Sequence, residues 1–225
     1  MNKAQVRAQI EEFGIIPAIR LSSAEQARFA AEAVHSAGLP IVEIPLTVPG
    51  ALDLISALRK DFPDLVVGAG TVLDAGTARR ALEAGALFLT STGLDVTVVG
   101  LAVAEGVLAL PGALTPTEII NAWKAGADFV KVFPCGSLGG DTYIRALKAA
   151  LPQIRLIAGG GVQQHTAGRY ISAGASAIGV GKELITNEAI RLRKAEWILE
   201  LAHRFMAAVK NARTQTPSAN VVRFK

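Results

Sequence analysis

Short apolar segments alternate with longer amphipathic segments along almost the whole chain. Each apolar segment is rich in Ile, Val, Leu or Phe and is followed by a turn of small residues, after which apolar positions recur at helical spacing. Segments such as Leu65-Val66-Val67 are apolar throughout, which is typical of parallel strands buried on both faces. The pattern predicts alternating strands and helices, with strands opening near Ile15, Ile41, Leu65, Leu87, Val107, Phe129, Arg155 and Ala177.

Eight successive strand–helix units predict an α/β fold of the (βα)8 TIM barrel type. An open doubly wound sheet is the alternative, but the first unit has no Gly-x-Gly-x-x-Gly motif, and eight units of similar size close more naturally into a barrel. Because no linker interrupts the units, we expect one domain over residues 1–212, with an N-terminal helix over Met1–Phe13 that covers the bottom of the barrel. Residues 213–225 are expected to form a polar, basic tail.

Residues that typically start helices precede several of the predicted helices. They are Ser22 followed by Glu25, Asp74, and Thr115-Pro116 followed by Glu118. These signals place the helix starts directly after the turns that follow the strands.

Composition narrows the class of protein. A chain with 51% hydrophobic and 19% charged residues is not expected to be disordered. The single cysteine, Cys135, excludes a disulfide framework and a cysteine-ligated zinc site. No apolar run reaches the length of about 18 residues that spans a membrane, and the first residues lack the apolar core of a secretion signal. We therefore expect a cytoplasmic protein that does not associate with membranes.

The net charge of +4 raises the question of a nucleic-acid partner. Aromatic residues make up only 5% of the chain and are not interleaved with the basic residues, so no nucleic-acid site is expected. A mildly positive protein is suited to a small anionic substrate.

The candidate catalytic residues lie on the predicted strands, because active sites of such barrels form at the carboxyl ends of the strands. Lys131 lies in the apolar run Phe129–Phe133, where burial disfavours its charged form, and a neutral amine attacks ketones to form a Schiff base. Glu43 is a second ionisable group in an apolar strand. The two side chains would form a structural ion pair, or a nucleophile beside a proton-transferring base. The sequence alone leaves both interpretations open.

Two glycine clusters predict an anion site. Gly160-Gly161 and Gly181-Lys182 follow the seventh and eighth predicted strands, where barrels commonly bind phosphate through backbone N–H groups. Arg20, at the end of the first strand, is a further cation suited to a carboxylate or a phosphate. Lys182 is also a rival Schiff-base lysine, although its place after a glycine turn predicts an exposed ammonium group. The histidines fall on different predicted helices, so no metal site is expected.

Five motifs carry a family resemblance that extends from about Ile15 to Leu184. They are Val42–Pro49, Gly68–Leu73, Leu110–Gly112 with Thr115–Glu118, Val130–Pro134, and Gly160–Val162. In this order and spacing they resemble the 2-keto-3-deoxy-6-phosphogluconate (KDPG) and 4-hydroxy-2-oxoglutarate (KHG) aldolase family, which includes the 6-phosphogalactonate aldolases.

The resemblance implies a class I aldolase, a lyase without metal or cofactor that is usually a homotrimer. It implies cleavage of a KDPG-type phospho-sugar acid, or of 4-hydroxy-2-oxoglutarate, to pyruvate and an aldehyde such as glyceraldehyde 3-phosphate. Lys131 would form the Schiff base with the 2-oxo acid, and Glu43 would transfer protons. The substrate would contact Arg20, Thr47, Gly70, Thr71, Pro111 and Phe133, and the phosphate would contact Gly160, Gly161, Gly181 and Lys182.

Four positions depart from the family pattern: Thr47 replaces an arginine, Gly136 a carboxylate, Gly159 a threonine and Lys182 a serine. The departures at Gly159 and Gly136 favour the alternative of a non-catalytic barrel that binds a 2-oxo acid or a sugar phosphate. The presence of both Lys131 and Glu43 favours the aldolase, because a pure binding protein does not need an amine buried beside a base. A phosphosugar isomerase or epimerase would need paired carboxylates or a histidine at the strand ends, where only Glu43 is present.

Overall fold

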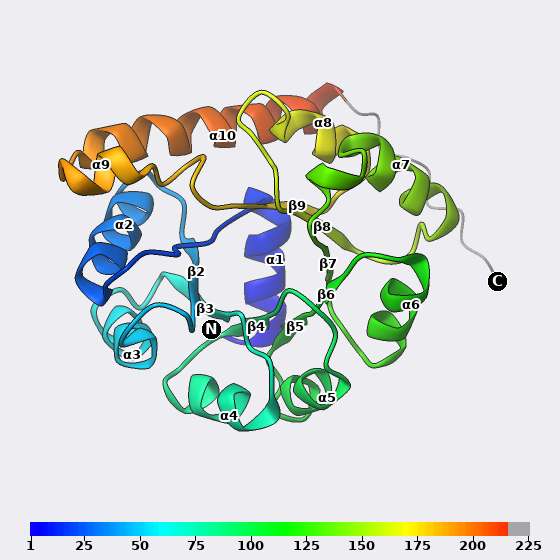
Figure 1. Ribbon diagram of the computed structural model, residues 1–225, viewed down its shortest axis with the longest axis horizontal. Helices are drawn as coiled ribbons and strands as arrows, with labels where there is room; N and C mark the ends of the chain where they lie inside the picture. Colours follow the sequence, from blue (N-terminus) through cyan, green and yellow to red (C-terminus); the bar gives the residue numbers. More distant parts are fainter. Residues whose placement is uncertain (216–225) are drawn as a thin grey trace.

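Parallel strands form the centre of the molecule, and helices form a ring around them (Figure 1). This computed structural model describes residues 1–215. The strands open within one residue of the predicted positions, which confirms the strand order inferred from the apolar segments. The strands are β1 (Ile15–Pro17), β2 (Ile41–Pro45), β3 (Val66–Gly70), β4 (Phe88–Thr90), β5 (Leu108–Leu110), β6 (Gly112–Ala113), β7 (Val130–Val132), β8 (Leu156–Gly159) and β9 (Ala177–Val180).

One helix follows nearly every strand. The helices are α1 (Lys3–Phe13), α2 (Ala24–Ser36), α3 (Ala51–Asp61), α4 (Ala75–Glu83), α5 (Val96–Ala104), α6 (Pro116–Lys124), α7 (Asp141–Ala150), α8 (Ala167–Ser172), α9 (Asn187–Arg191) and α10 (Ala195–Gln215). Asp74 caps α4, and Thr115 forms a capping box with Glu118 at the start of α6, as predicted. The cap of α2 is Ser23 rather than Ser22, whose hydroxyl instead donates to Gln26 Oε1 at 2.9 Å.

The strands close into a barrel. Two runs of parallel strands, β1-β9-β8-β7-β6 and β2-β3-β4-β5, meet at a bridge between Ala18 and Glu43, where Ile19 N–H donates to the Glu43 carbonyl at 2.9 Å. At the other junction β5 and β6 are consecutive in the chain and are separated only by Pro111. Proline has no N–H to continue a ladder, so β5 and β6 are two halves of the fifth barrel strand. The closed ring excludes the open doubly wound sheet.

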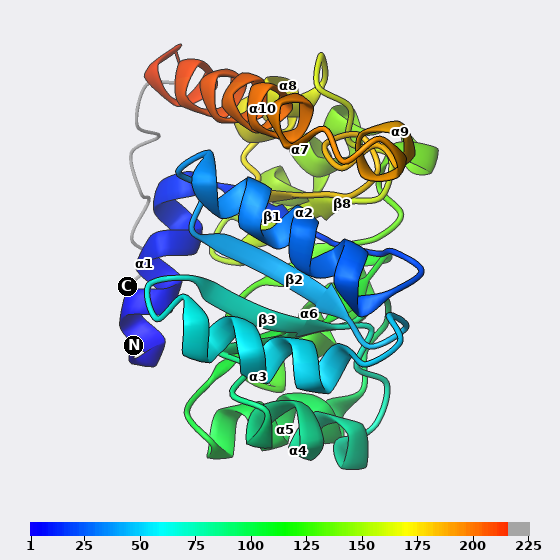
Figure 2. The ribbon, with the colours of Figure 1, turned by 90° about the vertical axis from the view of Figure 1, so that its left-hand side faces the viewer.

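Apolar side chains fill the lower part of the barrel interior, and α1 closes this lower end. Val6 and Ile10 of α1 pack against strand residues such as Ile41, Phe88 and Leu108. Figure 2 shows α1 lying across one end of the barrel. The buried Asp128 carboxylate pairs with α1 through Lys3, at 3.0 Å, and Arg7. The predicted covering role of the N-terminal helix is therefore confirmed.

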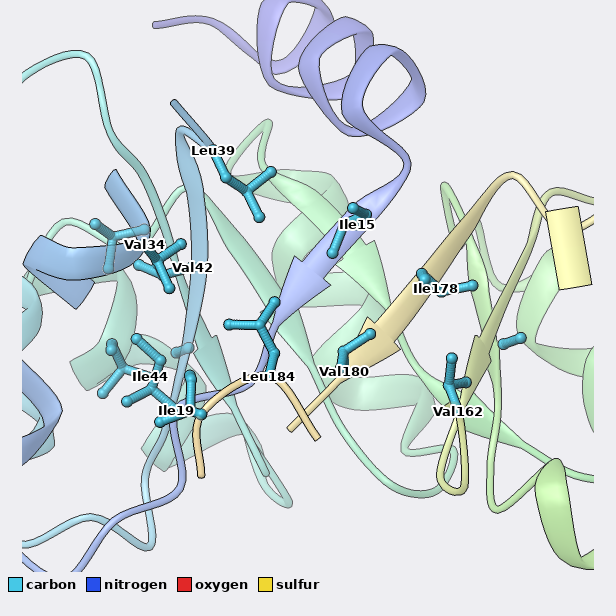
Figure 3. Packing of buried hydrophobic residues seen from close by; sticks show 14 of the residues in the cluster. Ile15, Ile19, Val34, Leu39, Val42, Ile44, Val162, Ile178, Val180 and Leu184 are labelled. Carbon is cyan, nitrogen blue, oxygen red and sulfur yellow. The ribbon is translucent and has the colours of Figure 1, made fainter. Parts of the chain in front are cut away.

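A second apolar layer lies between the strands and the surrounding helices. Figure 3 shows part of it, with Ile15, Val42 and Ile178 from the strands and Val34 from α2. Because side chains alternate along a strand, the neighbours of these outward residues point into the barrel. That alternation decides which polar side chains enter the interior.

The last helix extends past the predicted domain boundary at residue 212. α10 continues to Gln215, and Arg213 donates to the carbonyl groups of Glu12 and, at 3.2 Å, Ser176. Of the predicted tail, residues 213–215 are therefore helical, and residues 216–225 lie outside the described residues. No helix of residues 1–215 has the length and apolar character needed to cross a bilayer.

Candidate active site

Lys131 of β7 and Glu43 of β2 meet inside the barrel. Each lies between two residues that pack in the outer apolar layer, so each points inward. Lys131 Nζ lies 3.3 Å from Glu43 Oε2, and the two side chains are only 11% and 4% exposed. Lys131 Nζ also lies 3.4 Å from the Thr90 hydroxyl at the end of β4. Thr90 is a site residue that was not predicted, although its place at the end of a predicted strand was a signal that could have found it.

The pair combines a nucleophile with a proton acceptor at contact distance. A carboxylate this close to an ammonium group can take its proton and leave a neutral amine, and it is placed to move further protons near the same nitrogen. The ion pair that stabilises the resting protein thus becomes a nucleophile and a base when a ketone enters. The two interpretations left open by the sequence are compatible in this geometry.

Gly70 of β3 gives the Glu43 carboxylate its space. A Cβ at residue 70 would lie 2.2 Å from Glu43 Oε1, well inside van der Waals contact. The next residue, Thr71, has a φ of 58°, which is strained for a β-branched side chain, and its hydroxyl accepts from Arg20 Nη2 at 3.3 Å. The end of β3 is therefore shaped around the carboxylate and linked to a cation.

Gly70→Ala is expected to lower kcat by about 100-fold, because the added methyl group displaces the Glu43 carboxylate from Lys131. Steady-state cleavage kinetics on the folded variant would measure this. Gly93→Ala is the matched control, since a Cβ at Gly93 meets no atom within 4 Å. A Gly70→Ala protein with the kcat of the control would show that the position of Glu43 is unimportant.

A cavity of about 430 Å³ opens above the Lys131–Glu43 pair. Phe133 lies beside the amine, with Lys131 Nζ 5.8 Å from the centre of its ring. The cavity is lined by the predicted residues Arg20, Glu43, Lys131, Phe133, Gly160, Gly161, Gly181 and Lys182, and also by residues not predicted, among them Thr92, Gly179, Glu183 and Asn187. The structure thus brings the predicted amine, base and anion-binding residues around one space.

Four other predicted substrate contacts do not line this cavity: Thr47, Gly70, Thr71 and Pro111. Gly70 lies against Glu43, as described above. Thr47 and Thr71 line a neighbouring hollow of about 650 Å³, which also contains Asp74 and Arg80. Pro111 is buried between β5 and β6, and its carbonyl accepts from Lys131 N–H at 2.9 Å. Substrate contacts by these residues stay predictions.

Besides Lys131 and Glu43, the charged residues Arg20, Lys182 and Glu183 line the cavity. Among residues 1–215, neither Arg20 nor Lys182 forms an ion pair. Gly160 and Gly161 have φ angles of 76° and 89°, which side chains rarely adopt, and Gly136 N–H holds their turn by donating to Gly160 O at 2.8 Å. The two cations and the glycine turn suit an anionic group. Lys182 is exposed, as predicted, whereas Lys131 is buried beside a carboxylate.

Within the described part of the chain, no cluster of three or more His, Cys, Asp or Glu side chains is placed to hold a metal ion. Cys135 is buried, and its Sγ lies 3.7 Å from Gly160 O. This position agrees with a packing role for Cys135 behind the glycine turn.

Cys135 is expected to react with a thiol reagent such as DTNB on the order of 100-fold more slowly in the native protein than in the unfolded chain. Burial raises the pKa of the Cys135 thiol, and a raised pKa leaves the unreactive protonated form in excess at neutral pH. Labelling at pH 8 with and without guanidinium would measure the difference. Equal rates would contradict the buried, protonated thiol.

Comparison with known proteins places this site in a family. The family model for KDPG and KHG aldolase matches residues 6–201. The 2-dehydro-3-deoxy-phosphogluconate aldolase of Treponema pallidum is 32% identical over 163 residues, which cover 72% of this chain and 78% of that protein. The 2-dehydro-3-deoxy-6-phosphogalactonate aldolase of Escherichia coli K12 is 36% identical over 154 residues, covering 68% and 75%.

A solved structure agrees with these relatives. The KDPG aldolase of Legionella pneumophila, with pyruvate captured as a covalent carbinolamine intermediate, superimposes with a TM-score of 0.81 at 27% identity, covering 89% of this chain and 96% of that one. The region matched by the family model contains Lys131, Glu43 and both glycine turns. With the barrel, the buried amine and its carboxylate in place, the chain belongs to the KDPG and KHG aldolase family.

Proposed function

We propose that this protein is a class I aldolase that cleaves a 2-keto-3-deoxy-6-phospho-sugar acid to pyruvate and an aldehyde such as glyceraldehyde 3-phosphate. The observation that carries this proposal is the Lys131 amine, buried in the barrel 3.3 Å from the Glu43 carboxylate. An amine held in this way can form a Schiff base, and the carboxylate can serve each proton transfer that the reaction needs.

The reaction begins when the Lys131 amine, having given its proton to Glu43, adds to the C2 carbonyl of the substrate. Loss of water from the resulting carbinolamine gives an iminium ion. Removal of the C4 hydroxyl proton then breaks the C3–C4 bond, the aldehyde leaves, and the bonding electrons form an enamine. Protonation at C3 and hydrolysis release pyruvate and restore the amine. Because the iminium nitrogen accepts the electrons, the proposed reaction uses no metal or cofactor.

The charges around the cavity support an orientation for the substrate. Lys182 and the glycine turns favour an anionic group, such as a phosphate, at their part of the cavity, whereas Arg20 lies beside Thr71 at the end of β3. Gly70 lies beside Glu43, and the next residue, Thr71, contacts Arg20; these two residues would receive the carboxylate of the 2-oxo acid. KHG has a carboxylate where KDPG has a phosphate, and the same cations would hold it.

We also propose that the protein is a cytoplasmic homotrimer. Exposed large apolar side chains on and near α5 support an interface between copies. Val96 and Val103 lie on α5, Leu73 precedes α4 and Trp123 lies on α6. Sedimentation velocity should report a trimer, and replacing Val96 and Val103 by aspartate should yield monomers. A wild-type monomer at micromolar concentration would contradict the trimer.

Borohydride trapping with pyruvate tests the proposed function. The expected result is a reduced pyruvyl adduct, seen by intact mass spectrometry and located on the Lys131 peptide. An adduct on Lys182 would move the site to the exposed lysine. A folded protein that gives no adduct would contradict the aldolase and favour the non-catalytic barrel that binds a 2-oxo acid.

A further inference from the structure

One side of the Lys131 side chain faces a wall without side chains. Gly159 of β8 and Gly179 of β9 stand there, and Gly179 lines the cavity. A Cβ at residue 179 would have no atom nearer than 3.8 Å, and Lys131 Cε would be one of the atoms at that distance. A Cβ at residue 159 would lie only 3.1 Å from the same carbon. There is thus space for a methyl group between Lys131 and β9, in ordinary contact with both.

The strand order places the space at Gly179 on the side of Lys131 opposite to Thr90. Around the barrel, β7 is separated from β4 by the fifth barrel strand, β5 and β6, on one side, and from β9 by β8 on the other. Thr90 reaches Lys131 Nζ from β4 at 3.4 Å, whereas Gly179 leaves the β9 side open. Glu43, on the strand across the barrel, contacts the nitrogen itself. The reacting nitrogen is therefore surrounded by the Thr90 hydroxyl, the Glu43 carboxylate and the Phe133 ring, and the space towards β9 stays open.

The open side lies next to the position of the substrate carbons C2 and C3 in the Schiff base. In the Schiff base, the iminium carbon C2 is attached to Nζ, and C3 is the next carbon. A substituent on C3 is close to Lys131 Cε when it turns towards β9. The neighbours of that space are Lys131 Cε, the Cα of Gly159 and the Ala158 carbonyl oxygen, each 3.8 Å from the Cβ position of residue 179. None of them is displaced by a methyl group.

We propose that this aldolase accepts 2-oxo acids with an alkyl substituent on C3, of which 2-oxobutanoate is the simplest, and that Gly179 determines this specificity. The inference rests on the proposed function of the Lys131 amine. The amine adds to C2 of 2-oxobutanoate, water leaves, and Glu43 takes one of the two C3 protons as the C–H electron pair becomes the enamine double bond. C3 then bonds to an aldehyde carbon, whose oxygen receives the proton. Hydrolysis releases a 3-methyl-4-hydroxy-2-oxo acid and the free amine.

Exchange of the C3 protons in D₂O, followed by proton NMR, tests this step without any aldehyde. The wild type is expected to exchange the C3 protons of both pyruvate and 2-oxobutanoate. In Gly179→Ala the added methyl group occupies the space, so the ratio of kcat/KM for 2-oxobutanoate to that for pyruvate should fall about 10-fold or more. Gly93→Ala, whose added Cβ meets no atom within 4 Å, should leave the ratio unchanged.

The outcomes separate this inference from the proposed function. Wild-type protein that exchanges pyruvate but not 2-oxobutanoate would overturn the inference and leave the aldolase intact. A Gly179→Ala variant in which both rates fall together would also overturn it, because Gly179 would then be needed only for the structure. Absence of exchange with either compound would contradict the proposed function itself.

Discussion

Lys131→Ala is expected to abolish aldol cleavage, with kcat lower by about 10⁵-fold or more. The amine forms the covalent bond to the substrate, and the other lysine that lines the cavity, Lys182, is exposed. The borohydride adduct with pyruvate should disappear together with the activity. Steady-state kinetics and peptide mass spectrometry on the same preparation would measure both effects.

The alanine variant is also expected to have a lower free energy of unfolding, so a second variant is needed as a control. Removing Lys131 leaves the Glu43 carboxylate buried without its cation, which typically costs about 3–5 kcal/mol. Lys131→Arg keeps a positive charge beside Glu43, but its guanidinium group does not lose a proton and forms no Schiff base. We expect Lys131→Arg to be as inactive as Lys131→Ala and more stable in thermal unfolding.

Lys182→Ala is the matched control for the nucleophile. It should still give the pyruvate adduct on Lys131, while the KM for a phosphorylated substrate rises because one cation at the anionic end is lost. If Lys131→Arg retained the adduct, or Lys182→Ala lost it, the assignment of the Schiff base to Lys131 would be wrong.

The sequence was most informative about the barrel and the reacting pair. Strands buried on both faces appear as apolar runs, so an ionisable residue inside such a run is conspicuous, and both Lys131 and Glu43 stand out in this way. Their contact at 3.3 Å could not be obtained from either run alone, because it depends on closure of the barrel. Closure also explains Thr90, whose hydroxyl reaches Lys131 only because β4 and β7 face a common interior.

Other features depend on atoms that a sequence pattern does not represent. Thr47 follows a predicted strand end as closely as other expected contacts do, yet it lines the neighbouring hollow rather than the cavity above Lys131. Glycines are a further example. A Cβ at Gly70 would collide with Glu43, whereas one at Gly179 would fit without a close contact. Glycine is therefore required at residue 70, whereas at residue 179 it leaves open space. Only the three-dimensional surroundings distinguish the two positions.

Glu43→Gln separates proton transfer from covalent bond formation. Glutamine has nearly the same shape as glutamate and can keep a hydrogen bond to Lys131, but its amide cannot accept the proton from C3. Loss of a positioned base costs typically about 10²–10⁴-fold in rate, and we expect a decrease of this size both in cleavage and in exchange of the pyruvate C3 protons in D₂O.

The trapped adduct distinguishes loss of the base from loss of the site. If Glu43 acts mainly in proton transfer, Glu43→Gln still yields the borohydride adduct on Lys131 after long incubation, although C3 exchange remains slow. Thr90→Val is the matched control, because it removes the other polar contact to Nζ and leaves the carboxylate. Thr90→Val should reduce exchange only about 10-fold, because the Thr90 hydroxyl accepts one hydrogen bond from Lys131 Nζ but does not act as the base. Equal exchange rates in Glu43→Gln and wild type would show that water or another group removes the proton, and would leave Glu43 as the structural partner of the lysine.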